Sequence, residues 1–246
     1  MDVRQRARLD DGDHGVDGSA SKVAAGNGEG KTRGMELTER AQAIEAARAL
    51  VREDRRAVLG LAGAPGAGKS TLARAVVDAL GEAAAYVPLD GFHLSNAQLD
   101  RLGLRDRKGS EPSFDVWGYA ALLRRLARDD GRDVYVPDFD RDLDEPVAAS
   151  HRVAPGARLI VTEGNYLACD LPGWREARAL MDRLWYVDAP PDVRDARLMR
   201  RHVAHGRTEF ASRAWIDAND APNAGLVEGV VVGCDAWVRL GGGGVG

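Results

Sequence analysis

The stretch "GAPGAGKST", residues 63–71, fits the phosphate-binding pattern G-x-x-x-x-G-K-[ST]. The run "RRAVLGLAGAPG" predicts a short apolar strand that enters a glycine turn. After the turn, Leu72, Val76 and Leu80 are spaced as on one face of a helix. Glycines in such a turn let backbone N–H groups converge on phosphate oxygens, and the helix N-terminus adds its positive dipole. We therefore predict a phosphate-binding loop made of Gly63, Ala64, Pro65, Gly66, Ala67, Gly68, Lys69, Ser70 and Thr71.

Two side chains of this loop have expected roles toward a nucleoside triphosphate. Lys69 is expected to reach the β- and γ-phosphates, and Ser70 is expected to bind Mg²⁺. A second stretch, "GNGEGKT" at residues 26–32, resembles the loop but has three residues between Gly26 and Gly30, where the pattern needs four. No apolar strand leads into it, and no amphipathic helix directly follows, so we attribute this match to chance.

Composition narrows the class of protein and its partners. The 246 residues suffice for one sizeable α/β domain, and 44% hydrophobic with 29% charged residues is ordinary for a globular protein. The net charge of -4 argues against a general nucleic-acid surface, and no apolar run approaches the roughly 18 residues that span a membrane. The two cysteines make neither a disulfide framework nor a metal cluster. We expect a cytoplasmic protein that acts on a small molecule, without a nucleic-acid or membrane partner.

The chain is expected to divide into two tails and one domain. Residues 1–34 are rich in Gly, Asp, Ser and Ala and predict a disordered tail, and residues 241–246 predict a flexible one. In the domain, residues 35–240, strands alternate with helices, beginning with an amphipathic helix over 36–52. This order, together with the phosphate loop, predicts an α/β fold of the P-loop NTPase type, a three-layer sandwich with a mostly parallel sheet. A helical lid is expected over about residues 194–215 because of the arginine-rich helix described below.

One predicted strand, "AAAYVPLD", ends in a carboxylate whose place is informative. Ligands of parallel sheets collect beyond the carboxyl ends of the strands. Asp90 ends the strand that follows the helix of the phosphate loop, so it should approach the γ-phosphate of a bound triphosphate. It is either the base for an acceptor hydroxyl, as a kinase requires, or a capping or turn residue. The other predicted strands are "DVYVPDF", "ARLIVTEG", "RLWYVDA" and "DAWVRL", with "EPVAASHRVAP" as a hairpin arm.

The order of the motifs is similar to that of a known family. After the phosphate loop come "PLDGFHLSN", "RKGSEPSFD", "VPDFDR", "VTEGNYL", "RLMRRH" and "DAPNAGLV". From Ala57 to Val238 the chain thus resembles the uridine kinase, phosphoribulokinase and pantothenate kinase group. It most resembles the nucleoside/nucleotide kinase-like branch, which includes fructose-transport-associated kinases. In "EPSFD", however, Glu111 stands where uridine kinases have a histidine, which argues against uridine or cytidine as the substrate.

The resemblance implies roles for several charged side chains. Asp90 matches the catalytic aspartate of the group, and Glu163 would lie near Mg²⁺, directly or through water. Asp140 and Arg141 belong to the segment that leads into the acceptor arm. They bind acceptor hydroxyls or a charged substituent, or else they form an ordinary surface ion pair.

The acceptor pocket has five further candidate residues. Lys108 is either a clamp on substrate or phosphate or a plain surface residue. Phe92 belongs to the pocket wall or to the core, and His93 to the pocket or to the surface. Asn165 and Tyr166, directly after the strand that ends at residue 163, are expected to line the acceptor pocket.

The helix predicted after two prolines carries several arginines. Arg194, Arg197 and Arg201 share one face, where they repel one another unless an anion lies opposite. The hypothesis is a lid that closes over the triphosphate, and the alternative is a solvated basic face. The run "RLMRRH" resembles the lid run of the group, with Arg197 and Arg201 expected in catalysis and Arg200 at ATP. Asn223 is expected to contact adenine or the lid, or to cap a helix.

These residues predict an ATP- and Mg²⁺-dependent kinase that transfers the γ-phosphoryl group to a hydroxyl of a small metabolite. The acceptor is a nucleoside, a sugar such as fructose, or a pantothenate-like alcohol. A GTPase is disfavoured because no lysine lies in an N/T-K-x-D run. The alternative is a non-kinase P-loop ATPase or a nucleotide-dependent accessory protein of a transport system.

Overall fold

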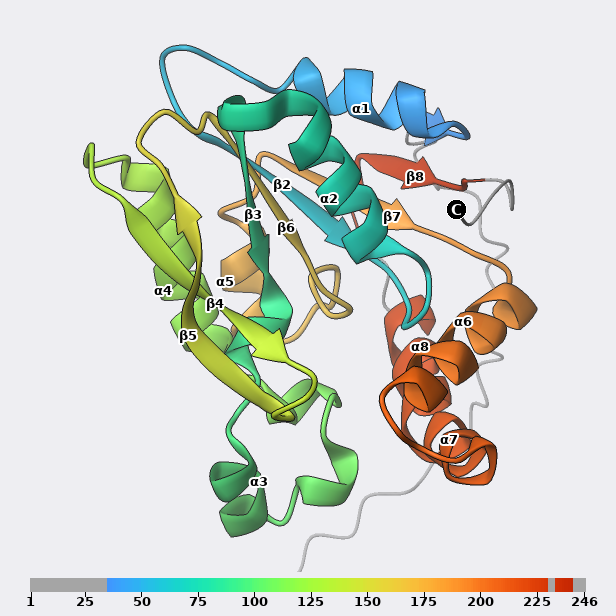
Figure 1. Ribbon diagram of the computed structural model, residues 1–246. Helices are drawn as coiled ribbons and strands as arrows, with labels where there is room; N and C mark the ends of the chain where they lie inside the picture. Colours follow the sequence, from blue (N-terminus) through green and yellow to red (C-terminus); the bar gives the residue numbers. More distant parts are fainter. Residues whose placement is uncertain (1–34, 230–232, 241–246) are drawn as a thin grey trace, which may run out of the picture. The chain divides into compact units, whose positions relative to one another are not determined.

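The computed structural model describes residues 35–229 and 233–240 (Figure 1). The tails predicted over residues 1–34 and 241–246 lie outside these ranges. None of the described helices is both long and apolar enough to span a membrane.

A parallel sheet of six strands forms the centre of the described chain (Figure 1). The strand order is β1-β8-β7-β2-β6-β3, with every neighbouring pair parallel. All six residues of β2 are buried, as expected for a central strand covered on both faces. The strands are β1 Met35–Leu37, β2 Ala57–Ala62, β3 Ala84–Pro88, β6 Leu159–Glu163, β7 Arg183–Val187 and β8 Ala236–Val238.

Helices cover the sheet on both faces, so the predicted three-layer sandwich is confirmed (Figure 1). Alternate residues of β2 enter two separate apolar cores, because successive side chains of a strand point to opposite faces. Leu59 and Leu61 pack with α1, Arg40–Arg48, and α2, Lys69–Leu80. Val58 and Ala62 pack with α4, Val116–Arg128, and α5, Trp174–Arg178.

The remaining elements surround the carboxyl ends of β2, β3, β6 and β7 (Figure 1). On one side lie an antiparallel hairpin, β4 with β5, and the short helix α3. On the other side, α6, α7, a π-helical turn and α8 follow one another. Their bounds are β4 Val134–Asp140, β5 Glu145–Val153, α3 Asn96–Leu102, α6 Pro191–Ala204, α7 Glu209–Trp215, the turn Ile216–Asp220 and α8 Ala221–Gly229.

One expectation about the elements needs correction. The helix predicted over 36–52 is wrong at its start, because Met35–Leu37 is a strand that pairs with β8, near the end of the chain. Three residues are too few to show a period, and the partner lies about 200 residues away, so no local pattern marks this strand. The expected hairpin arm is confirmed, because "DVYVPDF" forms the strand β4 and pairs with β5, which contains "EPVAASHRV", outside the parallel sheet.

Candidate active site

The phosphate loop joins β2 to α2, as its sequence predicts. Gly68 caps α2 with a positive φ of 100°, and the helix begins at Lys69. Gly66, with φ of 77°, lies against α6, where an added Cβ would come within 2.7 Å of the carbonyl oxygen of Arg194. Glycine is therefore required both by the turn and by the close approach of the loop to the next helix.

The ammonium group of Lys69 is buried inside this loop. Its side chain donates to the carbonyl oxygen of Ala64 at 3.0 Å and to Oδ1 of Asn165 at 2.7 Å. Burial lowers the pKa of Lys69 to about 8, although the charges of Glu163 and Asp90 act in the opposite direction. The structure thus brings Asn165 to the phosphate loop, where it orients Lys69.

A second buried group, the Glu163 carboxylate at the end of β6, faces the start of α2. Its Oε1 accepts from the Ser70 hydroxyl at 3.0 Å and from the Tyr86 hydroxyl at 2.8 Å. Burial, and then the charge of Asp90, raise the pKa of Glu163. The Tyr86 ring is itself held between the Arg74 guanidinium, 5.1 Å from its centroid, and the edge of His151. Ser70 and Glu163, predicted together as metal ligands, are therefore in direct contact.

Asp90 lies just beyond β3, in a 3₁₀ turn that spans Leu89–Phe92. The strand ends two residues earlier than its sequence predicts. Gly91 makes the turn possible, since a Cβ there would collide with the backbone of Pro137 in β4. Oδ2 of Asp90 accepts from Nη2 of Arg141 at 3.3 Å, and both side chains keep roughly a third or more of their surface exposed, 35% and 41%.

The aromatic neighbours of Asp90 form one wall. The His93 ring lies 4.0 Å from Phe114 and 4.9 Å from Phe139, centroid to centroid, and its Nδ1 is 2.8 Å from the carbonyl oxygen of Asp90. Burial lowers the pKa of His93, which favours the neutral ring. Phe92 is partly buried and packs edge-on against Tyr119. Both residues support the turn that carries Asp90.

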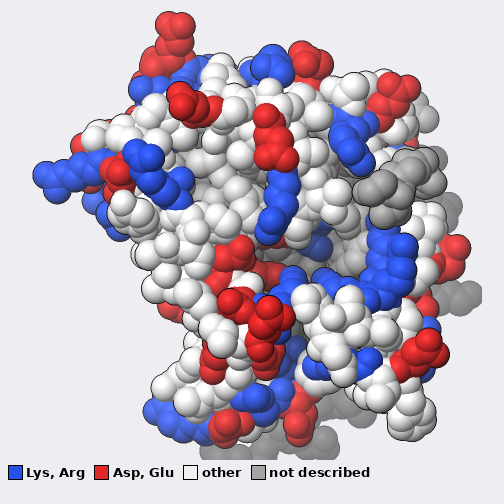
Figure 2. Space-filling view, viewed as in Figure 1, with Lys and Arg blue, Asp and Glu red and all other residues white. Residues whose placement is uncertain are grey.

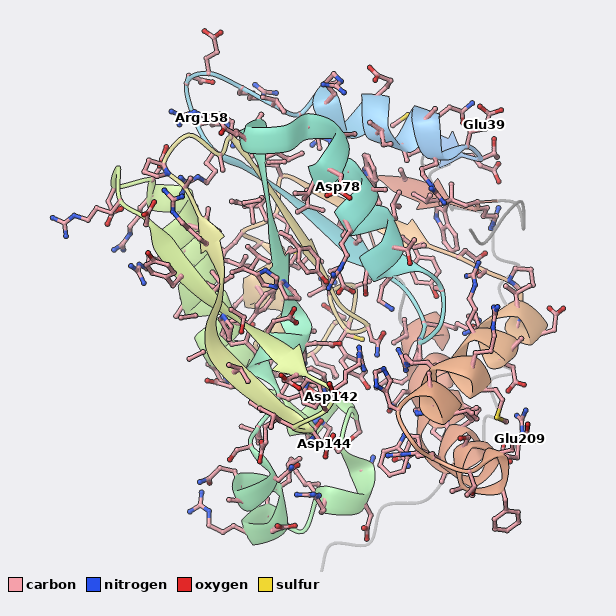
Figure 3. The ribbon with its side chains drawn as sticks, in the orientation of Figure 1. Glu39, Asp78, Asp142, Asp144, Arg158 and Glu209 are labelled. Atoms are coloured by element: carbon pink, nitrogen blue, oxygen red, sulfur yellow. The ribbon has the colours of Figure 1, made fainter. Side chains whose placement is uncertain are left out.

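Lys108 ties α3 to the tip of the hairpin. Its ammonium group donates to Oδ1 of Asn96 at 2.6 Å and to the backbone of Asp144, and it lies 2.9 Å from the Asp144 carboxylate. Figure 3 shows Asp142 and Asp144 at this tip, next to α3. Oδ1 of Asp140 accepts from the backbone N–H groups of Asp142 and Leu143, both at 2.9 Å, and so closes the hairpin turn.

Tyr166 and Asn223 meet at one backbone atom of the segment that follows α3. The carbonyl oxygen of Gly109 accepts from the Tyr166 hydroxyl at 2.7 Å and from Nδ2 of Asn223 at 3.3 Å. Tyr166 is fully buried, and Asn223 on α8 is 8% exposed. The structure therefore places Asn223 on the acceptor side, where α8 touches the loop after Lys108. Glu111, the departure from the uridine kinase pattern, accepts from the buried Trp174 indole at 2.5 Å.

The arginines of α6 have different surroundings. Nη1 of Arg197 donates to the carbonyl oxygens of Gly66 and Ala67 in the phosphate loop, each at 3.2 Å. Arg200 is exposed and donates within its own helix, to the carbonyl oxygen of Ala196. Arg201 is half-buried and lies 3.8 Å from Asp220, whose other oxygen is 2.8 Å from His202. Burial, and then the charge of Arg141, lower the pKa of Arg201.

A pocket of about 450 Å³ opens beside the phosphate loop. Arg194 and Arg197 form part of its lining, and its apolar walls come from the start of α6 and the segment after β8. Arg194 also pairs with Glu228 at 2.5 Å, while its Nε, though buried, has no hydrogen-bond partner among the described residues. The apolar lining residues are Ala189, Pro190, Pro191, Val193 and Leu240.

Charge is arranged unevenly around the site. Figure 2 shows a hollow with basic side chains toward α6 and acidic side chains toward the tip of the hairpin. No group of three or more His, Cys, Asp or Glu side chains in the described part of the chain could hold a metal ion alone. Ser70 and Glu163 nevertheless suit Mg²⁺, which usually takes one or two protein ligands and completes its shell with phosphate oxygens and water.

Some residues of the site could not be identified from a sequence motif. Tyr86 looks like an ordinary strand residue, yet β3 pairs with β6 so that its hydroxyl meets Glu163. Asn96 and Asp144 are 48 residues apart, yet Nδ2 of Asn96 donates to the carbonyl oxygen of Asp144 at 2.9 Å, and Lys108 contacts both residues. Strand alternation alone could place Tyr86 on the α2 face of the sheet, but no pattern predicts its partner.

The loop, the buried lysine and the acidic groups beyond β3 and at the end of β6 are features of a P-loop protein. The sequence model of the phosphoribulokinase/uridine kinase family matches residues 58–213, and the chain belongs to this family.

Three relatives illustrate the similarity. A Schizosaccharomyces pombe protein, whose name proposes a uridine kinase, is 35% identical over 190 residues, covering 73% of this chain and 81% of its own. The Escherichia coli K12 protein YggC is 35% identical over 179 residues, covering 70% and 73%. A solved structure from Silicibacter sp. TM1040, described as a proposed fructose transport system kinase, is 36% identical with a TM-score of 0.73, covering 82% and 98%.

Proposed function

We propose that the protein is an ATP- and Mg²⁺-dependent kinase that phosphorylates a hydroxyl group of a small metabolite. The observation that carries this proposal is the position of Asp90. Its carboxylate lies in a turn beyond β3, close enough to raise the pKa of Glu163 and to oppose the lowering of the pKa of Lys69. It is also partly exposed to solvent, so an acceptor can reach it.

The nucleotide would occupy the loop and the pocket beside it. Backbone N–H groups at the start of α2 and the Lys69 ammonium group would hold the phosphates. The apolar pocket along α6 has the size and lining for the nucleoside, and Arg194 and Arg197 add positive charge to this lining. Arg197 already contacts the loop, and the charges of Asp90 and Glu163 favour the charged form of Arg201. These two arginines would stabilise the transferred phosphoryl group.

Asp90 would accept the proton of the acceptor hydroxyl as the oxygen attacks the γ-phosphorus, and ADP would leave. Its contact with Arg141 uses Oδ2 and leaves Oδ1 for the hydroxyl. Ser70 and Glu163 would hold Mg²⁺, which supplies positive charge next to the β- and γ-phosphates. A carboxylate at hydrogen-bond distance from an acceptor hydroxyl is the arrangement that general-base catalysis requires.

The acceptor hydroxyl belongs to a nucleoside, a sugar or a pantothenate-like alcohol. Fructose is one candidate, because the Silicibacter relative is described as a proposed fructose transport system kinase. The buried contact of Glu111 with Trp174 supports the argument against uridine and cytidine, since this side chain serves the core. We place the reaction in the cytoplasm, and the two free cysteines, Cys169 and Cys234, support a reducing compartment.

The test is a panel of small-molecule alcohols, scored by ADP formation with ATP and Mg²⁺. A kinase forms ADP only with the right acceptor, and mass spectrometry then finds a product heavier by one phosphoryl group. ADP formation that is equally fast without any acceptor would instead support a P-loop ATPase or a nucleotide-dependent accessory protein and would overturn the proposal.

A further inference from the structure

We propose that the acceptor carries an anionic group, a carboxylate or a phosphate, and that Arg141 binds this group beside Asp90. This inference rests on the proposed kinase function and names the chemical class of its second substrate. It starts from the cations around Asp90, which come from three different parts of the fold: Lys69 from the phosphate loop, Arg201 from α6 and Arg141 from the tip of the hairpin.

Two of these cations are placed to interact with the phosphates of ATP. Lys69 lies inside the phosphate loop, and Arg201 is on the helix whose Arg197 contacts that loop. Arg141 belongs to neither element, and its turn lies on the acceptor side, next to α3. The charges of a bound triphosphate therefore do not account for a third cation at this place.

Arg141 has donors to spare. A guanidinium group has five N–H donors in a planar fork. Within the described part of the chain, the Arg141 side chain makes one hydrogen bond, from Nη2 to Asp90 at 3.3 Å. Of this side chain, 41% is exposed. The remaining fork fits a carboxylate or phosphate in two-point contact. A neutral polyol offers no group that uses this geometry as well.

Arg141 and Arg201 share the charge of Asp90, which accepts a hydrogen bond from Arg141 and also favours the charged form of Arg201. The charge of Arg141 disfavours the charged form of Arg201, so the two guanidinium groups repel each other. The nearby carboxylates are shared: Asp220 is also 2.8 Å from His202, and Asp90 interacts with both arginines and is to receive the acceptor hydroxyl on Oδ1. An anion bound between them relieves this repulsion, whereas a neutral ligand leaves it in place.

Two sets of contacts fix the backbone of the hairpin turn that carries Arg141. Asp140 caps the turn by accepting two backbone N–H groups, and Lys108, 9% exposed, fastens the Asp144 end of the same turn to α3. Lys108 is thus committed to the protein and is not a free substrate clamp. Positioning of this kind lowers the entropy lost when Arg141 binds its ligand.

The experiment compares acceptors in matched pairs that differ by one anionic group: glycerate with glycerol, ribose 5-phosphate with ribose, and fructose 6-phosphate with fructose. We expect the charged member of at least one pair to be phosphorylated with about 30-fold or higher kcat/KM, the scale of a charge-assisted two-point contact. Arg141→Gln should remove that preference mainly through the KM of the acceptor, and Arg141→Lys should restore it in part.

The matched control is Arg152→Gln. Arg152 lies on β5 of the same hairpin, is exposed, and pairs with Asp133 away from the turn. This variant should behave as the wild type in both kcat/KM and the KM for ATP. Arg141→Gln should likewise leave the KM for ATP within about twofold, because the side chain belongs to the acceptor side.

A second measurement needs no acceptor. Inorganic phosphate is titrated by calorimetry into the full chain with AMP-PNP and Mg²⁺ present, so that the phosphate loop is filled. We expect saturable binding that Arg141→Gln abolishes and Arg152→Gln preserves.

Three results would overturn the inference. They are a preference for the neutral member of every productive pair, an equal loss for both members in Arg141→Gln, and a lack of any Arg141-dependent phosphate binding. A neutral preference would leave the proposed kinase function standing, whereas ADP formation independent of every acceptor would remove both.

Discussion

Binding of a nucleotide should make the protein take up a proton, and the amount should rise with pH. Burial lowers the pKa of Lys69 to about 8 in the nucleotide-free protein. Phosphate oxygens next to the ammonium group favour its charged form and return the pKa toward the usual lysine value of about 10.4. Any Lys69 that is neutral before binding must therefore gain a proton when the nucleotide arrives.

The pKa fixes the size of the effect. With a pKa of about 8, the neutral fraction of Lys69 is about 0.1 at pH 7, 0.5 at pH 8 and 0.9 at pH 9. Uptake should follow these fractions, in protons per bound nucleotide. Ionisation of Glu163, whose pKa burial raises, has the opposite sign, because it releases a proton, and it diminishes as pH increases. Both contributions therefore make the net uptake rise with pH, but a positive net uptake that approaches one proton at high pH is specific to the lysine.

The assay is calorimetric titration of AMP-PNP and Mg²⁺ into the protein in buffers that differ in ionisation enthalpy. The slope of the observed binding enthalpy against the ionisation enthalpy of the buffer gives the number of protons exchanged. Lys69→Arg is the matched variant, since a guanidinium stays charged throughout this range and should remove the uptake. An uptake that is flat or falls between pH 7 and pH 9, or that persists in Lys69→Arg, would refute the reasoning.

Two further changes test contacts around the site. Tyr86→Phe removes the hydroxyl that donates to Oε1 of Glu163 and so raises the pKa of that carboxyl further. The acid limb of the pH–rate profile should therefore move to higher pH. Half-saturation of the enzyme with Mg²⁺ should need about tenfold more of the ion. The exposed Tyr135→Phe serves as control, and equal Mg²⁺ requirements in both variants would exclude this role for Tyr86. Glu111→Ala should lower the free energy of unfolding by about 2 kcal/mol, because it leaves the buried Trp174 indole unpaired. Glu111→Gln retains an acceptor and should cost less than about 1 kcal/mol in urea titrations; an equal loss in both variants would contradict the explanation.

The sequence predicted the parts of the fold that depend on local patterns of residues. The strand, glycine turn and helix at residues 57–80 follow from apolar spacing and from the positions of glycine, and the structure has them in place. The parts that could not be predicted depend on distant partners. The strand β1 pairs with β8, which lies at the other end of the domain sequence, whereas the hairpin of β4 with β5 joins neighbouring segments and was expected.

The same distinction applies to the candidate site. Lys69, Ser70 and Glu163 were predicted from motifs, and the structure brings them to one place through β2, α2 and β6. Lys108 could not be interpreted from sequence, because its partners Asn96 and Asp144 come from α3 and the hairpin tip. Asn223 meets Gly109 only after α8 has packed against the acceptor side.

The most direct test of the central claim is Asp90→Asn. With the acceptor that the panel identifies, we expect phosphoryl transfer to fall by about 10²- to 10⁴-fold, the usual share of a general base, while the Kd for AMP-PNP and Mg²⁺ stays within about twofold. The amide keeps the shape of the side chain but cannot take the proton. An Asp90→Asn protein that transfers phosphoryl at the wild-type rate would contradict the account.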